Sequence, residues 1–245
     1  MGVVQMIKGP LLPFLLAVPI VLFEALSLSG CVSTSPSLPD LYIVSFVRNT
    51  TTPPTELRFG YMGICGSDNH TLHCRASVGR SVDALFPSLF PDLNGTHTGK
   101  QKAAAAQRVA DVKALLQTAR TLQSKVFVPL LAGAGVFFLV GLLSLPLLRR
   151  ITRHPEKAQR VGGKFRLVTQ ACLALSAVLA FTASLATSQA AGALQFSTLV
   201  SAPGTHIAAR PGVALQVMQW LAFAFTLVFA AAVSWFARVD EKEWQ

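Results

Sequence analysis

Four long apolar runs alternate with polar segments along the chain. The runs cover residues 10–32, 126–148, 167–188 and 213–236. Each reaches the roughly 20 residues that a helix needs to cross the hydrocarbon layer. Because lipid offers backbone groups no hydrogen-bond partner, each run is expected to be helical. The pattern predicts a mainly α membrane protein built on a bundle of four transmembrane helices.

The polar segment of residues 33–125 carries its own strand signals. Residues 41–47 are rich in β-branched and aromatic side chains, and alternating apolar positions then form a second strand that runs from Leu57 into Cys65. A third strand is expected from Thr71 through Cys74 to Val78. Three apolar residues between prolines predict a turn or short helix that caps the sheet: Phe86, Leu89 and Phe90. The segment therefore predicts a small antiparallel sheet.

The pattern becomes helical over residues 100–125. Val109, Val112, Leu116 and Ala119 recur on one stripe of this segment, and most basic residues lie elsewhere. Two arrangements fit the stripe. The helix either continues unbroken into the second span as a projecting rod, or it lies separately on the lipid surface as an amphipathic helix.

Composition and charge support a membrane protein and fix its orientation. Of the 245 residues, 52% are apolar and only 13% are charged. Seven of the basic residues lie in the short segment 149–166, whereas residues 189–212 contain only Arg210. The positive-inside rule therefore makes 149–166 cytoplasmic, together with residues 1–9 and 237–245, and places 33–125 and 189–212 outside. The net charge of +10 needs no nucleic-acid partner, because much of it lies where topology and anionic lipid favour it.

The first apolar run has two alternative interpretations. Leu28-Ser29-Gly30-Cys31 resembles a lipoprotein cleavage box, and the run before it resembles a secretory signal peptide. Either reading would remove the first span. Against both, the basic region before the run is reduced to Lys8, the run exceeds the usual signal core, and Glu24 interrupts it. We expect the span to be retained, with Cys31 an unpaired thiol at its outer end or bound to a partner not yet identified.

Cysteines and glycosylation sequons agree with this topology. Cys65 and Cys74 share the outer compartment and are predicted to form a disulfide, whereas Cys172, near the cytoplasmic end of the third span, cannot reach Cys31. Three acceptor sequons begin at Asn49, Asn69 and Asn94, all in the segment that the charge rule places outside. Their position predicts a glycoprotein of the secretory pathway.

The run Gly60-Tyr61-Met62-Gly63-Ile64-Cys65, followed by Cys74, carries a family resemblance. This pattern places two glycines around apolar residues and leads into a cysteine pair. It resembles the motif of the fungal mating-induced calcium-regulator and membrane-fusion family, which consists of claudin-like tetraspan proteins. The tryptophan of true claudins is absent, which favours the fungal family. The resemblance implies four spans and a first outer loop folded as a small, disulfide-clasped antiparallel sheet. It also implies a plasma-membrane protein needed for low-affinity calcium influx and for cell fusion during mating.

Polar groups inside the membrane and catalytic motifs are few. Glu24 is the one acid within a span and is the best intramembrane candidate for a functional group. It is alternatively protonated, or hydrogen-bonded to an adjacent helix as part of bundle packing. The five histidines are scattered, and we find no nucleotide loop, nucleophile elbow or EF-hand. We therefore expect no enzyme activity, no cofactor and no bound metal.

Charge within the outer loop separates the possible roles in calcium entry. A calcium-selective pore normally uses rings of carboxylates, but residues 33–125 hold ten Lys or Arg against six Asp or Glu. This favours an accessory or regulatory subunit, whose partners are lipid and other membrane proteins, either a calcium channel or further copies of the chain. The competing function is a structural organiser of plasma-membrane compartments without an ion-transport role. A transporter working alone is disfavoured because no inverted repeat or broken helix is evident.

Overall fold

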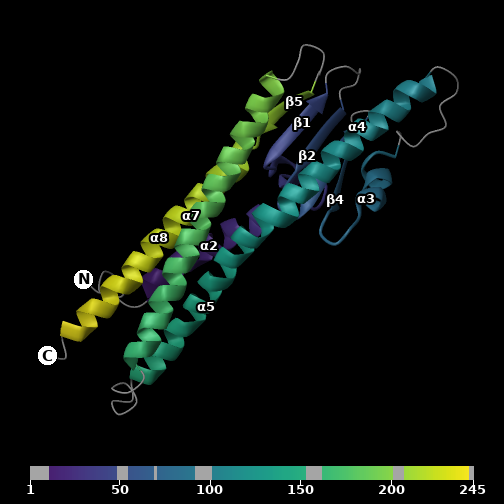
Figure 1. Ribbon diagram of the computed structural model, residues 1–245. Coiled ribbons are helices and arrows are strands. Elements are labelled where there is room, and N and C mark those ends of the chain that lie inside the picture. The colour runs from purple at the N-terminus through teal and green to yellow at the C-terminus, as the bar shows by residue number, and fades with distance from the viewer. Residues whose placement is uncertain are drawn as a thin grey trace. The chain divides into compact units, whose positions relative to one another are not determined.

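The computed structural model describes residues 11–48, 55–68, 71–91, 101–152, 162–200 and 207–242. The predicted glycosylation sites Asn49, Asn69 and Asn94 lie outside these residues. The chain divides into two compact units. The helical unit comprises residues 1–24, 130–184 and 218–245, and the sheet unit comprises residues 25–129 and 185–217. Figure 1 shows the chain with most of its helices and strands labelled.

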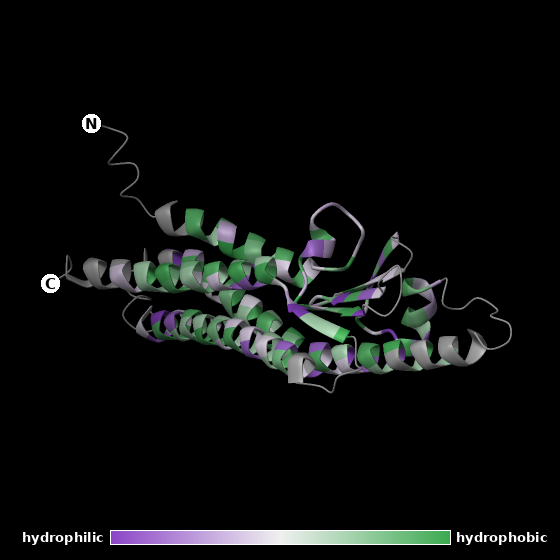
Figure 2. Cartoon of the chain, turned by 90° about the horizontal axis from the view of Figure 1, so that it is seen from above, coloured by the Kyte–Doolittle hydropathy of each residue, from purple (hydrophilic) through white to green (hydrophobic). Residues whose placement is uncertain are grey.

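Helices account for most of the described chain. They are α2 (Leu11–Ser29), α3 (Val82–Leu89), α4 (Gln101–Leu122), α5 (Val128–Thr152), α7 (Gly163–Val200) and α8 (Val213–Lys242), with a short 3-10 helix η1 (Leu38–Asp40) and a π-helical segment η3 (Gln123–Phe127). Because α4, η3 and α5 follow one another without a break, the predicted outer helix does continue into the second apolar run. Hydrophobic residues predominate along the long helices (Figure 2).

Three stretches of the described residues are long and apolar enough to cross a membrane. They are Val112–Leu148, Gly163–Ser197 and Val213–Trp235. The first apolar run forms helix α2, whose apolar stretch Leu15–Ser29 is shorter. The helix ends at Ser29 rather than at residue 32, and Cys31 already has a left-handed backbone, with φ of 59°. The chain is thus a mostly helical membrane protein, and the fourth crossing stays a prediction.

The core of the helical unit is aromatic and aliphatic. One buried cluster consists of Ala17, Ile20, Phe138, Leu173 and Phe229. In it the rings of Phe138 and Phe229 pack edge to face, with their centroids 5.3 Å apart. Side-chain hydrogen bonds in this unit lie within one helix or join two neighbouring helices. Ser176 donates a hydrogen bond of 2.9 Å to the carbonyl oxygen of Ala134. Such contacts are typical of helices packed in lipid.

In the part of the sheet unit that the structure describes, five strands form one antiparallel sheet. The strands are β1 (Val44–Arg48), β2 (Thr55–Phe59), β3 (Gly63–Asp68), β4 (Thr71–Ala76) and β5 (Ile207–Pro211), in the order β4-β3-β2-β1-β5. The predicted second strand is wrong in one respect. It does not run from Leu57 to Cys65 but breaks at Gly60–Met62, where the chain reverses between β2 and β3. The sequence analysis also missed β5, which comes from the second polar segment and pairs with β1.

One face of the sheet is the core of this unit. In register across the strands, Leu57 pairs with Phe46 and Phe59 pairs with Val44, and these side chains are buried. Helix α3, which the Ser81 hydroxyl caps by accepting from the Ala84 amide, packs on β3, β4 and α4. Of the three apolar residues that predicted a cap, Phe86 and Leu89 lie on the buried face of α3, and Phe90 follows the helix directly.

Candidate functional site

The glycine-rich run forms the turn between β2 and β3. The amide of Gly60 donates a hydrogen bond of 2.9 Å to the carbonyl oxygen of Gly63 and closes the turn. Tyr61 inside it is fully buried, whereas Met62 is half-buried. The sequence motif is therefore a tight turn that places an aromatic ring inside the unit, rather than part of a continuous strand.

The two motif glycines are required by close approach of another backbone segment. A side chain on Gly63 would overlap the carbonyl group of Cys31, and one on Gly60 would lie 2.5 Å from the carbonyl oxygen of Gly30. A third glycine, Gly66, lies under the ring of Phe90. Residues 30–32, which follow helix α2, thus cross the motif turn at a distance that only glycine permits.

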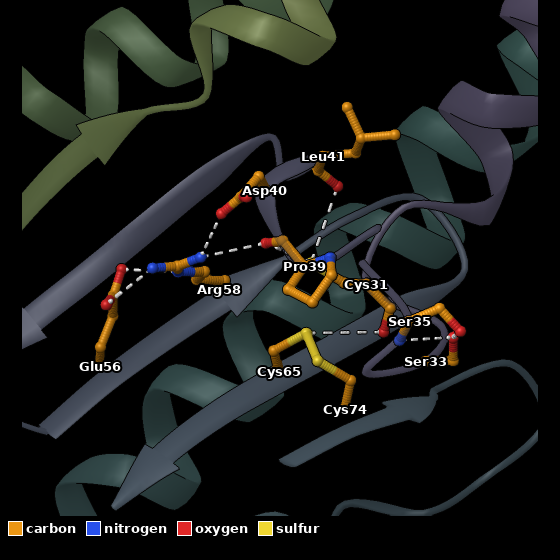
Figure 3. The surroundings of a disulfide bond; sticks show 10 residues. All are labelled: Cys31, Ser33, Ser35, Pro39, Asp40, Leu41, Glu56, Arg58, Cys65 and Cys74. Carbon is orange, nitrogen blue, oxygen red and sulfur yellow. Dashed lines mark hydrogen bonds and ion pairs between the residues drawn. A yellow bond between two sulfur atoms is a disulfide. The ribbon is translucent and has the colours of Figure 1, made fainter. Parts of the chain in front are cut away.

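The predicted cysteine pair closes the hairpin beside this crossing. Cys65 on β3 and Cys74 on β4 are directly opposite each other in register, and their sulfur atoms lie at disulfide distance. Cys31 packs against both of them in one buried cluster. The Cys65 sulfur lies 3.8 Å from the carbonyl oxygen of Cys31 (Figure 3). The disulfide therefore braces the same segment that the motif glycines contact.

Cys31 is a free and fully buried thiol just beyond the end of α2. Its backbone is left-handed, with φ of 59°, and its amide donates to the carbonyl oxygen of Leu38 at 3.0 Å. Burial raises the pKa of the Cys31 thiol to about 12. The group therefore stays protonated at physiological pH, and it is neither a nucleophile nor a ready metal ligand.

A charged cluster lies on the same face of the sheet as the disulfide. Arg58 pairs with Cys65 in register, and its guanidinium donates to Glu56 at 2.8 Å and to Asp40 at 2.9 Å (Figure 3). It also lies over the ring of Tyr42 at 5.3 Å. The hydrogen bond with Glu56 raises the pKa of Arg58 above its ordinary value. These contacts hold the segment before β1 against the sheet.

Two residues of η3 hold the motif turn from the other side. Gln123 is 3% exposed, and its Nε2 atom donates a hydrogen bond of 2.9 Å to the carbonyl oxygen of Gly60. Its Oε1 atom accepts from the Ser77 hydroxyl at 2.6 Å. The ring of Phe127 packs edge to face on the ring of Tyr61, with the two ring centroids 6.2 Å apart. The sequence analysis missed Gln123, although its place four residues after the stripe position Ala119 is a usable signal.

Glu24 belongs to the helical unit, whereas the motif turn belongs to the sheet unit. The residue is 7% exposed, and its Oε1 atom has no hydrogen-bond partner among the described residues. A side chain on Gly135 of α5 would come within 3.0 Å of its Oε2 atom. Its functional role stays a prediction.

The fold and the site together define a class: a membrane protein that carries a small, disulfide-clasped antiparallel sheet with a glycine-rich turn. The sequence model of the family described as Ca2+ regulator and membrane fusion protein Fig1 matches residues 42–239. The chain belongs to this family. The match includes the motif turn, both paired cysteines and β5. No curated protein matches the chain.

Proposed function

We propose that this protein regulates low-affinity calcium influx and membrane fusion during fungal mating, as an accessory subunit of the plasma membrane. Family membership supports calcium regulation and membrane fusion. In this proposal the chain crosses the membrane four times, with both termini in the cytoplasm and the sheet outside. Asn49, Asn69 and Asn94 then carry glycans on the outer segment.

The observation that carries the accessory role is the construction of the motif turn. Gly60 and Gly63 admit no side chain, the Cys65–Cys74 disulfide braces the hairpin beside them, and Gln123 holds the Gly60 carbonyl. A buried turn held so firmly keeps the sheet that carries it in one conformation, which favours recognition of another protein because little conformational entropy is lost on binding. The excess of Lys and Arg over Asp and Glu in residues 33–125 disfavours a calcium pore within this loop.

The direct test is calcium uptake in mating-induced cells with and without the chain, with cell fusion counted in the same cultures. We expect both to fall when the chain is deleted and to recover with the intact chain. The Cys65→Ser/Cys74→Ser form should not restore them. Cys172→Ser is the matched control, since Cys172 is a free cysteine outside the clasp. Surface labelling of each variant separates loss of function from loss of the protein.

Unchanged calcium uptake in the deletion strain would overturn the regulator proposal. If plasma-membrane compartments are altered at the same time, the chain is a structural organiser. Reduced uptake with normal fusion would restrict the function to calcium entry.

A further inference from the structure

An open hollow lies between the start of α3 and one face of α4 and η3, all within the sheet unit (Figure 1). Its volume is about 560 Å³. Val82 and Asp83 of α3 line one side, and the other side runs along the helix from Ala110 to Ser124. Sites for small molecules measure roughly 300–1,000 Å³. The hollow is therefore large enough for a ligand bigger than a single ion.

An ion pair joins the two sides of the hollow. The Nζ atom of Lys113 lies 2.8 Å from Oδ1 of Asp83 and 5.5 Å from the centre of the Phe86 ring. These contacts hold α4 against α3. The neighbouring lining residues Ala110 and Ala114 are small, so they leave the space between the helices open.

Arg120 supplies the charge that this ion pair leaves over. It is half-buried, and it forms no ion pair within the part of the chain that the structure describes. The lining has two basic side chains, Lys113 and Arg120, against one acidic side chain, Asp83, so one positive charge remains. A guanidinium can donate two parallel hydrogen bonds to a phosphate or carboxylate. The hollow therefore suits one anionic group.

The hydroxyl groups of the lining suit a different kind of partner. Thr121 donates its hydroxyl proton to the carbonyl oxygen of Gln117 at 2.9 Å, and Ser124 donates to the carbonyl oxygen of Thr121 at 3.4 Å. Their oxygen atoms keep lone pairs, which accept hydrogen bonds from hydroxyl groups but give nothing to a second anion. The amide of Gln117 can both donate and accept. The lining thus matches one oxyanion attached to a group that carries hydroxyls.

The position of the hollow along the helix limits where that anion comes from. Helices α4, η3 and α5 follow one another without a break, and the apolar run begins at residue 126. At 1.5 Å per residue, Ser124 lies about 3 Å and Arg120 about 9 Å along the axis from this run. The headgroup layer is about 5–7 Å thick on each side of the hydrocarbon. A long arginine side chain reaches into this layer, and any tilt of the helix brings Arg120 nearer.

We propose that the hollow binds a phospholipid with a polyol headgroup, such as inositol, from the membrane that the chain itself crosses. Arg120 holds the phosphate, and Gln117 and Thr121 bind hydroxyls of the headgroup. The acyl chains stay in the bilayer. This site goes beyond the proposed function and does not depend on a role in calcium entry, because it requires only that the run 126–148 lies in a membrane.

Native mass spectrometry of the full-length protein in detergent, with added lipid, tests the site. Phosphatidylinositol is compared with phosphatidylserine, which has the same net charge but no polyol, and with phosphatidylcholine, whose net charge is zero. We expect phosphatidylinositol to bind about tenfold more tightly than phosphatidylserine, because a headgroup without a polyol leaves the polar lining unpaired. Phosphatidylcholine should bind more weakly still.

Substitutions in the lining separate the phosphate contact from the headgroup contact. Arg120→Gln should weaken phosphatidylinositol binding about tenfold, because it removes the charge-assisted hydrogen bonds. Gln117→Leu should weaken it about threefold and leave phosphatidylserine binding unchanged. Lys125→Gln is the matched control. Lys125 is an exposed base next to Ser124 and outside the lining, so its loss should change the affinity by less than about twofold.

An equal loss of affinity in Lys125→Gln and Arg120→Gln would show diffuse attraction to the membrane surface and would overturn the site. Equal binding of phosphatidylinositol and phosphatidylserine would overturn it as well. Free inositol phosphate that binds as tightly as phosphatidylinositol would place the ligand in solution and contradict the lipid source.

Thermal unfolding of each variant without lipid separates loss of the site from loss of the fold. If Arg120→Gln does not fold, Arg120→Lys keeps the charge without the planar fork and should weaken binding about threefold. Full affinity in a folded Arg120→Lys variant would contradict the assigned phosphate contact. Failure of the proposed function has a different signature, since calcium uptake would then be unchanged in the deletion strain while lipid binding by the purified protein is unaffected.

Discussion

Different kinds of contact stabilise the interior of the sheet unit and the interior of the helical unit. In the sheet unit, backbone atoms approach Gly60 and Gly63 so closely that no side chain fits, and a disulfide braces the hairpin. In the helical unit, the contacts are largely between apolar side chains, such as the rings of Phe138 and Phe229. Close backbone contacts depend on particular residues, whereas apolar packing accepts side chains of similar volume. The two units should therefore respond very differently to small substitutions.

The largest effect is expected at the motif turn. Gly63→Ala places a methyl group on the carbonyl of Cys31, and neither backbone can yield easily. We expect a loss of roughly 4 kcal/mol in the free energy of unfolding, or failure to reach the cell surface. Thermal unfolding in detergent and surface labelling measure the two outcomes.

Gly192→Ala is the matched control for this substitution. Gly192 lies in helix α7 with nothing within 4 Å of a new Cβ, so the exchange should be neutral or slightly stabilising. If Gly63→Ala melts at the same temperature as Gly192→Ala, the backbone of Cys31 does not approach Gly63 as closely as described.

The clasp should give the next largest effect. Cys65→Ser and Cys74→Ser each break the same bond, so each single variant and the double variant should lose about 2–3 kcal/mol. The effects should not add, because the two residues act as one unit. Thermal unfolding of the three variants provides the comparison. A double variant that loses twice as much as either single variant would argue against a Cys65–Cys74 bond.

A smaller effect is expected in the helical unit. Phe138→Leu keeps most of the buried volume, so it should cost about 1 kcal/mol in unfolding free energy. Leu143→Val, at a position that is 65% exposed, should cost almost nothing. Unfolding in detergent measures both. A loss at Phe138 as large as that of Gly63→Ala would remove the contrast between the two units.

The smallest effect concerns the reactivity of Cys31. Burial raises the pKa of its thiol to about 12, so the reactive thiolate stays scarce as the pH rises from 7 to 9. Maleimide labelling of Cys31 in the folded protein should therefore stay far slower than in the unfolded chain at every pH from 7 to 9, and it should not level off within this range. Labelling of the folded protein that is as fast as that of the unfolded chain, or that levels off near the ordinary thiol pKa of about 8.5, would show that the thiol is accessible and ordinary.

Local sequence patterns specify much of the sheet but not its pairing. Thr71 to Cys74 and the strand before Arg48 were predicted because β-branched and aromatic residues cluster there. The break at Gly60–Met62 was missed because the alternation of Leu57, Phe59 and Tyr61 continues through it. Only the antiparallel register of β2 and β3 shows that Tyr61 lies in a turn.

Contacts between distant segments explain the remaining omissions. Strand β5 carries a weak signal, IAARP, and it forms because β1 offers an unpaired edge more than 150 residues earlier in the chain. Gln123 looked like one polar residue at the end of an amphipathic helix. Its role depends on Gly60 and Ser77, which are close to it only in the folded chain.

The sequence by itself determined the membrane class, the apolar runs, the cysteine pair and the family motif. Each of these depends on local composition or on spacing within a short segment, which the physics of lipid and backbone constrains directly. The tertiary structure decided why the motif glycines are needed, where Cys31 lies and how η3 meets the motif. These features depend on the approach of residues 30–32, 60–66 and 123–127 to one another, and local patterns carry no information about such distances.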